Sequence, residues 1–178
     1  MEIFKSEKIL VIGSSGAGKS TFSKKLHNIL NIPLIHLDTY YHKPNWEEPE
    51  KKDWENTVKK LVNQKEWIMD GNYAESFDIR IPKSDTIIFL DYNSFYCCFR
   101  VIKRVITDYG KRRSDMAKGC KESFDLSFLK FVLMFNYNNR RNIYNRLEKL
   151  KNIKNIIVLK NDSEVKLFLC QLRRNSVP

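Results

Sequence analysis

The chain has 178 residues, of which 42% are hydrophobic and 30% are charged, a composition that fits one globular domain and excludes a disordered or fibrous protein. No apolar run reaches the roughly 18–20 residues of a membrane helix, and the first residues lack a signal-peptide pattern, so we expect a cytoplasmic protein with no membrane partner. The formal net charge is +11, and residues 99–154 hold 15 basic and 5 acidic side chains, which indicates a polyanionic partner such as nucleotide phosphates or a nucleic-acid backbone.

Short apolar segments alternate along the chain with segments that have helical spacing. In chain order, the pattern predicts a strand at 8–12, a helix at 19–30, a strand at 33–37, a loop at 39–49, a helix at 50–64, strands at 67–69 and 85–90, a helix at 95–109, a polar loop at 111–120, one or two helices within 126–150, a strand at 155–159 and a helix at 163–172. Five buried strands separated by helices predict an α/β fold with a parallel sheet. We expect a single domain over residues 1–178, with two inserted mobile segments at 38–65 and 108–125.

Residues 13–20 form the strongest motif in the chain. Their sequence, GSSGAGKS, is G-x-x-x-x-G-K-S and lies directly between a predicted strand and a predicted helix. In such a loop, backbone N–H groups and the helix N-terminus bind phosphates, the lysine neutralises the β- and γ-phosphates, and the serine hydroxyl binds Mg²⁺. The predicted nucleotide-binding residues are Gly13, Ser14, Ser15, Gly16, Ala17, Gly18, Lys19, Ser20 and Thr21.

Acidic residues end three of the predicted strands, where ligands of open α/β sheets bind. Asp38 follows the second strand, Asp70 the third and Asp91 the fourth. Asp91 begins the segment DYNS, which is typical of a helix start, so a capping or turn role is the favoured interpretation there. Asp70 should lie beside the phosphate-binding loop, and we predict that it holds Mg²⁺ together with Ser20.

Arginines are the next candidates, because phosphoryl transfer requires positive charge around the moving group and a guanidinium fork matches phosphate. Arg100 and Arg104 lie four residues apart, on one face of a predicted helix. We expect about half of the clustered arginines to contact substrate. The cluster comprises Arg80, Arg100, Arg104, Arg112, Arg113, Arg140 and Arg141, with Lys111 beside it.

Aromatic residues fill the predicted loop after the second strand. His42 lies among Tyr40, Tyr41 and Trp46, and this group could either stack a base or sugar or form a small satellite core. His36, within the second strand, is interpreted as a packed core residue.

Several segments together resemble the bacterial topology modulation protein family, a branch of the adenylate-kinase-like P-loop kinases. They are GSSGAGKST at 13–21, LIHLDTYYHKPNW at 34–46, WIMDGNY at 67–73, TIIFLD at 86–91, the R-x-x-x-R pair at 100–104 and GKRRSDMAKGCKESFD at 110–125. The resemblance spans nearly the whole chain. It implies a P-loop NTPase three-layer sandwich with a five-stranded parallel sheet in the order 2-3-1-4-5, flanking helices, a substrate-binding insert at 38–65 and an arginine-bearing lid at 108–125.

The resemblance also implies roles for individual residues. The DGNY segment at 70–73 occupies the position of a D-G-F-P-R motif in nucleoside monophosphate kinases, and because its Pro-Arg is missing, Arg80 is the candidate replacement for the phosphate-clamping arginine. Asp38 falls where kinases of hydroxyl acceptors carry a substrate-binding acid. The expected substrate contacts are Asp38, Tyr41, Trp46, Asn72, Tyr73 and Arg80. The expected catalytic residues are Lys19, Asp38, Arg104, Arg112, Arg113 and Arg141.

The favoured function is phosphoryl transfer that uses ATP and Mg²⁺ as cofactors and a nucleotide, nucleoside or similar small molecule as acceptor. The alternative is a nucleotide-binding regulatory protein associated with DNA topology, without rapid kinase turnover, and DNA is kept open as a partner. A GTP-dependent switch is disfavoured because the chain has no N-K-x-D guanine motif. Four cysteines without a C-x-x-C pair favour reduced thiols over a disulfide scaffold or a zinc site, and the single Cys120 in the lid segment excludes a four-cysteine zinc lid.

Overall fold

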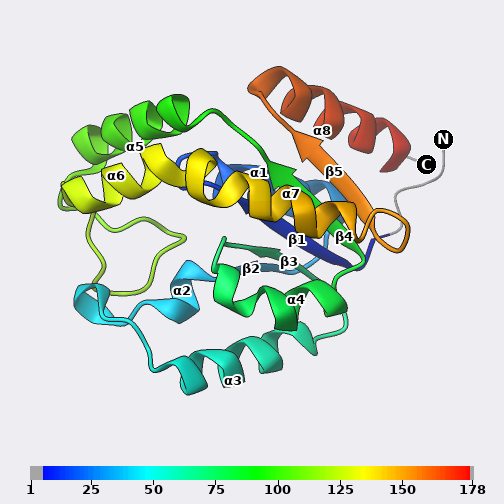
Figure 1. The fold of residues 1–178 in the computed structure, drawn as a ribbon, viewed down its shortest axis with the longest axis horizontal. Helices are drawn as coiled ribbons and strands as arrows, with labels where there is room; N and C mark the ends of the chain where they lie inside the picture. The colour runs from blue at the N-terminus through cyan, green and yellow to red at the C-terminus, as the bar shows by residue number, and fades with distance from the viewer. Residues whose placement is uncertain (1–5, 177–178) are drawn as a thin grey trace.

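A five-stranded parallel sheet organises the chain in the computed structural model, which describes residues 6–176 (Figure 1). The strand order is β2-β3-β1-β4-β5, which confirms the order implied by the resemblance. The strands are β1 (Lys8–Gly13), β2 (Leu34–His36), β3 (Trp67–Asp70), β4 (Thr86–Leu90) and β5 (Asn155–Leu159). The helices are α1 (Lys19–Leu30), α2 (Asp38–Tyr41), α3 (Lys51–Val62), α4 (Phe77–Lys83), α5 (Ser94–Asp108), α6 (Leu126–Phe135), α7 (Arg141–Glu148) and α8 (Asp162–Ser176).

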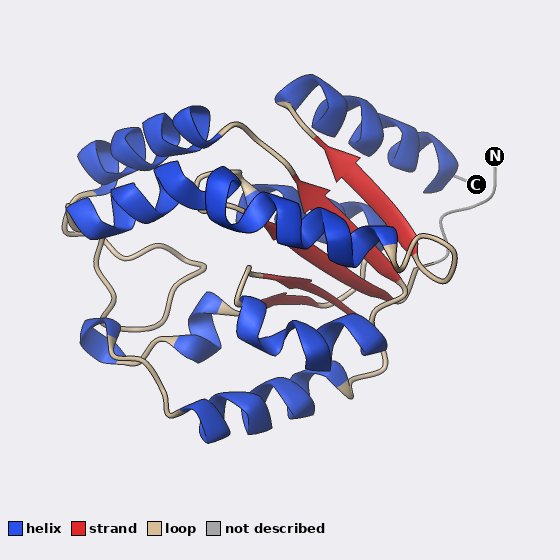
Figure 2. Cartoon of the chain, viewed as in Figure 1, coloured by secondary structure: helices blue, strands red, loops and turns tan. Residues whose placement is uncertain are grey.

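Helices cover both faces of the sheet, so the molecule has three layers (Figure 2). Successive residues of a strand point to opposite faces. Ile9 and Val11 of β1 therefore join a core with α1, α5 and α8, whereas Leu10 and Ile12 join a second core with α3, α4 and α7. Each of these four side chains is at most 1% exposed, and burying one contributes about 2 kcal/mol to stability. The two cores hold the carboxyl ends of β1, β2 and β3 at one edge of the sheet.

Most predicted elements are found within two or three residues of their expected ends, and three differences stand out. The predicted loop after β2 contains the short helix α2 and a 3-10 turn at Pro44–Trp46. Helix α4 was not predicted. It contains Pro82 one residue before its end, and a proline there removes an intrahelical hydrogen bond and cannot support a longer helix. The segment 126–150 is one helical run in which a π-helical turn, Asn136–Arg140, separates α6 from α7.

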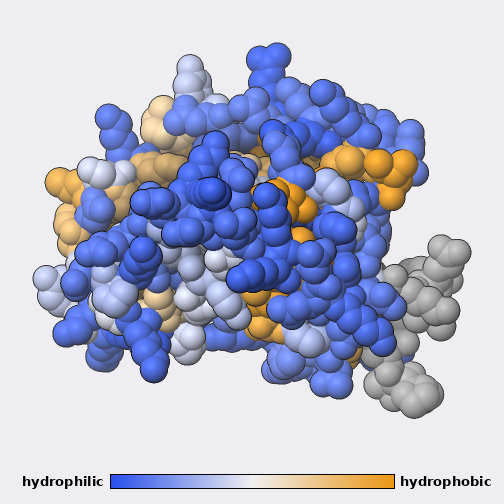
Figure 3. Space-filling view, turned by 90° about the horizontal axis from the view of Figure 1, so that it is seen from below, coloured by the Kyte–Doolittle hydropathy of each residue, from blue (hydrophilic) through white to orange (hydrophobic). Residues whose placement is uncertain are grey.

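The surface seen from below is largely hydrophilic, and its apolar side chains gather in small groups (Figure 3). Within the described residues, no helix is both long and apolar enough to cross a membrane. All four cysteines lie in the described part of the chain and are free thiols; Cys97, Cys98 and Cys120 are buried and Cys170 is exposed.

Candidate functional site

The loop between β1 and α1 has the geometry of an anion cradle. Gly16 and Gly18 adopt φ angles of +82° and +89°, which side-chain-bearing residues rarely adopt. A Cβ at Gly16 would also lie 2.3 Å from the carbonyl oxygen of Cys97, so only glycine fits there. Helix α1 starts at Lys19, and its first N–H groups face the loop, where they favour a negatively charged group.

Lys19 folds back over this loop. Its Nζ donates hydrogen bonds to the carbonyl oxygens of Gly13, at 3.1 Å, and Ser14, at 3.0 Å. Burial lowers the pKa of Lys19, while the nearby carboxylates of Asp38 and Asp70 act in the opposite direction. A partly desolvated cation held only by carbonyl oxygens and flanking acids gains a great deal from an arriving phosphate.

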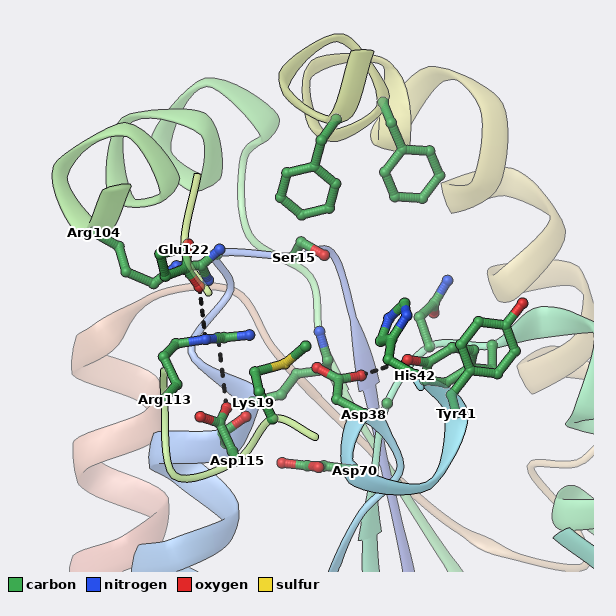
Figure 4. A pocket seen from close by; sticks show the side chains of 18 of the residues that line it. Ser15, Lys19, Asp38, Tyr41, His42, Asp70, Arg104, Arg113, Asp115 and Glu122 are labelled. Atoms are coloured by element: carbon green, nitrogen blue, oxygen red, sulfur yellow. Dashed lines mark hydrogen bonds and ion pairs between the residues drawn. The ribbon is translucent and has the colours of Figure 1, made fainter. Parts of the chain in front are cut away.

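A large pocket of about 1000 Å³ lies above the loop and collects residues from segments that are far apart in the sequence (Figure 4). Its size matches the range of small-molecule sites in proteins. The predicted site residues that line it are Ser15, Gly16, Gly18, Lys19, Ser20, Thr21, Asp38, Tyr41, Trp46, Asp70, Asn72, Tyr73, Arg104 and Arg113. The fold thus brings together most of the residues that the sequence singled out.

Asp38 and the aromatic residues form one end of this pocket. Tyr73 donates its hydroxyl hydrogen to Asp38 Oδ1 at 2.7 Å, which fixes the orientation of the carboxylate. The Tyr73 ring lies 4.4 Å from that of Tyr41 and 5.2 Å from that of Trp54, between centroids. Trp54 is fully buried and belongs to the core, so the aromatic group is both a satellite of the core and a lining of the pocket.

Asp70 ends β3 at the floor of the pocket and is 3% exposed. The parallel register of β2 and β3 sets His36 directly beside it. His36 Nδ1 lies 2.9 Å from Asp70 Oδ1 and 3.0 Å from Oδ2. His36 was expected to be a core residue, but here it orients the carboxylate of Asp70, our predicted metal ligand. Carboxylates that bind metals are commonly held in place by hydrogen-bond partners of this kind.

The segment between α5 and α6 closes the opposite end of the pocket through ion pairs. Arg113 Nε lies 2.8 Å from Glu122 Oε1, and Arg104 Nε lies 3.2 Å from the same oxygen. Arg113 also pairs with Asp115 at 3.5 Å. Burial alone would raise the pKa of Asp115, but Arg113 and the hydroxyl of Ser20 hold it below its ordinary value. In this structure the carboxylates of Asp115 and Glu122 therefore form the ion pairs with Arg104 and Arg113 that a bound phosphate would otherwise form.

Hydrogen bonds hold the two ends of this segment together and tie it to the rest of the site. Gly110 N–H donates to the carbonyl of Glu122 and Glu122 N–H donates to that of Lys111, each at 2.9 Å. Next to this base, Trp46 Nε1 donates to the carbonyl of Lys121 at 3.1 Å, and a Cβ at Gly119 would lie 2.9 Å from Pro44. Residues 119–121 thus contact the loop that follows α2.

Three arginines that were predicted as substrate-binding or catalytic residues do not reach the pocket. Arg80 is fully buried, and its guanidinium donates to Ser76 Oγ and to the carbonyl oxygens of residues 71–73 at 2.8–3.0 Å. These donors shape the loop after β3, so the position of Arg80 does not support its predicted role as a substrate contact. Arg112 is exposed, and its guanidinium donates to the carbonyl of Met116. Arg141 is exposed at the start of α7. Neither residue lines the pocket, so their positions do not support the predicted catalytic roles.

Two smaller corrections concern the predicted loop and Asp91. Gly13, Ser14 and Ala17 belong to the phosphate-binding loop but do not line the pocket. Asp91 is buried and accepts hydrogen bonds from Arg140 and from the Tyr144 hydroxyl, whereas Asn93 caps α5 by accepting from the N–H of Phe95. Arg140 is thereby a structural anchor for the helix that covers the site.

Sequence analysis also missed several pocket residues. Asp115 and Glu122 lie in a stretch dominated by basic residues, so their pairing with specific arginines has no signal in the sequence. Asn139 reaches the pocket from the π-helical turn, and such turns are often found at functional sites. The other lining residues that the sequence analysis did not single out are Lys24, Glu48, Gly71, Ala74, Glu75, Val105, Met116, Ser123, Asp125, Phe128 and Phe131. His42 and Arg100, which it discussed without placing them in the site, also line the pocket.

The loop and its neighbours fit a nucleotide with Mg²⁺. The glycines leave a cradle that a Cβ at Gly16 would fill, and the desolvated Lys19 ammonium faces it. Among residues 6–176 no group of three or more His, Cys, Asp or Glu side chains could hold a metal. Ser20 and Asp70 line the same pocket and offer a hydroxyl and a carboxylate, and Mg²⁺ commonly takes one or two such protein ligands together with waters and substrate phosphates.

Comparison with solved structures identifies the fold. Shikimate kinase from Bacteroides thetaiotaomicron superposes with a TM-score of 0.52 at 16% identity, over 96% of this chain and 98% of that chain. Deoxyadenosine kinase from M. mycoides, in a structure with dCMP and dCDP bound, superposes with a TM-score of 0.51 at 15% identity, over 94% of this chain and 98% of that chain. No protein-family model matches the sequence, and no curated protein matches it. The chain has the fold of the P-loop kinases: a five-stranded parallel sheet in the order 2-3-1-4-5 between layers of helices.

Proposed function

We propose that this chain is a kinase that transfers a phosphoryl group from ATP, with Mg²⁺, to a small acceptor. The observation that carries the proposal is that Lys19, Arg113 and Asp38 line one pocket. A phosphate-binding lysine, an arginine across from it and a carboxylate suited to an acceptor are the parts that phosphoryl transfer requires. The two solved neighbours, named as kinases of shikimate and of deoxyadenosine, are consistent with this reaction class.

Each residue has a definite task in this proposal. Bound Mg-ATP supplies the phosphoryl group and a divalent cation that offsets its charge. Lys19 and the loop N–H groups hold the phosphates, and Ser20 and Asp70 hold the metal. Arg104 and Arg113 offset the charge that spreads over the phosphoryl oxygens, and Asp38 accepts the proton of the acceptor.

The segment 108–125 acts as a lid in this proposal, and the segment 38–65 binds the acceptor. Closing the lid excludes water, which would otherwise take the phosphoryl group. The hydrogen bond between Trp46 and the carbonyl of Lys121 supports this view, because it links the segment 108–125 to the acceptor side of the pocket. We also propose, on the motifs quoted above, that the chain belongs to the topology modulation protein branch of these kinases.

The DNA-associated alternative gains no support from the site. Arg100, Arg104 and Arg113, which belong to the strongly basic segment, line the pocket, whereas Arg112 and Arg141 of the same segment are exposed. DNA binding through phosphates needs a basic surface that is accessible along the duplex.

Replacing Lys19 by alanine tests the proposed function. We expect phosphoryl transfer from ATP to fall by at least about 10²-fold, because a charge that stabilises the transition state is removed. Transfer of labelled phosphate from ATP would be measured against a panel of small hydroxyl compounds and nucleotides, with circular dichroism as the control for folding. Unchanged turnover in a folded K19A variant would contradict the assignment of the loop.

A further inference from the structure

The end of the pocket that faces away from the lid arginines is acidic. We call it the acceptor end and define it as the lining residues of α2, of the loop 42–48 and of the segment 71–75. Asp38, Glu48 and Glu75 contribute carboxylates to it, and no Lys or Arg from these segments is among its described lining residues. Figure 4 shows Arg104, Arg113 and Lys19 on the other side of Asp38. A phosphate placed at the acceptor end would therefore meet carboxylates without a local cation.

Histidine does not supply the missing charge. Burial lowers the pKa of His42, although Asp38 and Glu48 act in the opposite direction, so His42 is neutral at physiological pH. Its Nδ1 is buried without a hydrogen-bond partner in the described structure. A neutral imidazole can form a hydrogen bond with a ligand, but it cannot neutralise the negative charge of a phosphate.

Carboxylate and amide oxygens at the acceptor end are available as hydrogen-bond acceptors. Asn72 Oδ1 is buried without a partner in the described part of the chain, although Asn72 lines the pocket. The carboxylates of Glu48 and Glu75 lie close enough to Tyr41 to help raise the pKa of its phenol to about 12, after the larger effect of burial. Buried polar atoms without partners are costly, so this end is shaped for a ligand that brings O–H or N–H donors.

Arg80, the arginine expected at this end from the sequence, already has hydrogen-bond partners. Arg80, at the position where a phosphate-clamping arginine was expected, donates to three backbone carbonyls and a serine hydroxyl and is fully buried. Freeing it would leave those carbonyl oxygens without donors inside the protein. The free-energy cost of those lost hydrogen bonds keeps the Arg80 guanidinium from turning toward a phosphate on the acceptor.

Aromatic side chains give the acceptor end its shape. Tyr41 and Trp46 both line it, and His42 lies between them, with ring centroids 5.0 Å and 5.1 Å from the two. Trp46 is 38% exposed, so part of its surface is free to contact a ligand. Flat rings that contact one another edge to face form a wall against which another flat ring can pack.

We propose that the acceptor is an unphosphorylated hydroxyl compound with a flat ring and several O–H or N–H donors, neutral or positively charged, and that Glu48 and Glu75 reject phosphorylated analogues. This inference rests on the proposed kinase function and adds the class of its acceptor. In the reaction, the acceptor hydroxyl oxygen forms a bond to the γ-phosphorus while the bond from that phosphorus to the bridging oxygen breaks. ADP keeps the electron pair of the broken bond, and the hydroxyl proton passes to Asp38.

Paired ligands test the acceptor class on the full chain. The protein is first titrated with Mg²⁺ and a non-hydrolysable ATP analogue, and the loaded protein is then titrated calorimetrically with deoxyadenosine, deoxycytidine and pyridoxine and with the 5′-phosphate of each. We expect at least one unphosphorylated compound to bind, and each that binds to do so at least tenfold more tightly than its phosphate. Equal or tighter binding of the phosphates, or no binding by any pair, overturns the acceptor class.

Charge-neutral variants identify the groups that discriminate. In the double variant Glu48→Gln with Glu75→Gln, the preference for the unphosphorylated member should shrink by about fivefold or more, since each removed charge is worth about that factor at a few ångströms in a solvated site. Glu47→Gln is the matched control, because Glu47 adjoins Glu48 but does not line the pocket, and its preference should equal that of the wild type. An unchanged preference in the double variant overturns the role of these two carboxylates.

The first titration separates this inference from the proposed function. If the ATP analogue fails to bind, the kinase proposal fails and the acceptor class falls with it. If the analogue binds and the phosphorylated compounds are preferred, the acceptor class alone is wrong.

Discussion

Asp38 is the residue whose orientation depends most clearly on one neighbour. It begins α2, next to β2, and accepts the hydroxyl hydrogen of Tyr73 on Oδ1. A carboxylate held in this way can present its other oxygen to an acceptor without first losing rotational freedom. The same bond, with burial as the larger cause, raises the pKa of Tyr73, so the phenol remains a donor over the whole physiological range.

Asp38→Asn should therefore slow the chemical step more than it weakens binding. An amide of the same shape keeps the contact with the acceptor but cannot take its proton, so we expect kcat to fall by about 10²-fold or more with KM changed little. Steady-state kinetics with the acceptor identified by calorimetry would measure both constants. A rise in KM at constant kcat would instead assign Asp38 to binding alone.

Arg80 is expected to act on stability rather than directly on substrate. Replacing it by methionine keeps much of the volume but removes the donors to the carbonyls of residues 71–73 and to Ser76, and we expect a loss of about 3 kcal/mol in the free energy of unfolding. Urea unfolding followed by circular dichroism would measure it. Arg141→Met is the matched control: Arg141 is exposed, so its loss should lie within about 0.5 kcal/mol. Equal, small effects in both variants would show that the buried hydrogen bonds of Arg80 contribute little.

Among the elements, the proposed lid, residues 108–125, contains the clearest contrast between neighbouring residues. Arg113 faces the pocket and pairs with Glu122 and Asp115, whereas Arg112, the next residue, is exposed outside it. A γ-phosphate would compete with these carboxylates for Arg113. The direction of each arginine side chain is therefore a better guide to the function of this segment than its net charge.

Arg113→Ala and Arg112→Ala should consequently differ. We expect Arg113→Ala to reduce kcat by about 10²-fold or more, as for other arginines that stabilise transferring phosphoryl groups, and Arg112→Ala to stay within about twofold of the wild type. Turnover assays with saturating Mg-ATP would compare them. Equal losses in the two variants would mean that the lid acts through its total charge.

At the scale of the whole molecule, binding of nucleotide should stabilise the fold. A ligand at a hundred times its Kd adds about 2.7 kcal/mol, which for a chain of this size corresponds to a rise in Tm of roughly 5–10 °C. Mg-ATP should produce this shift in the wild type and a much smaller one in the Lys19→Ala variant, as measured by thermal unfolding. A shift that is unaffected by Lys19→Ala would place the nucleotide elsewhere in the molecule.

The sequence by itself determined the strands, most of the helices and the phosphate-binding loop. These features are local: apolar runs such as 8–12 and 155–159 form strands wherever they are buried, and the glycines and lysine of residues 13–20 act within a few residues of one another. The strand order followed from the resemblance rather than from any local pattern, and the structure confirmed it.

Only the tertiary structure decided which of the candidate charged residues belong to the site. Arg80, Arg112 and Arg113 are equally basic in the sequence, yet one is buried against backbone carbonyls, one is exposed and one faces the pocket. Likewise, Glu122 meets Arg104 and Arg113, and His36 meets Asp70, only because the fold brings distant segments together. The direction of a long charged side chain depends on the partners that surround it in space, and sequence spacing carries no record of those partners.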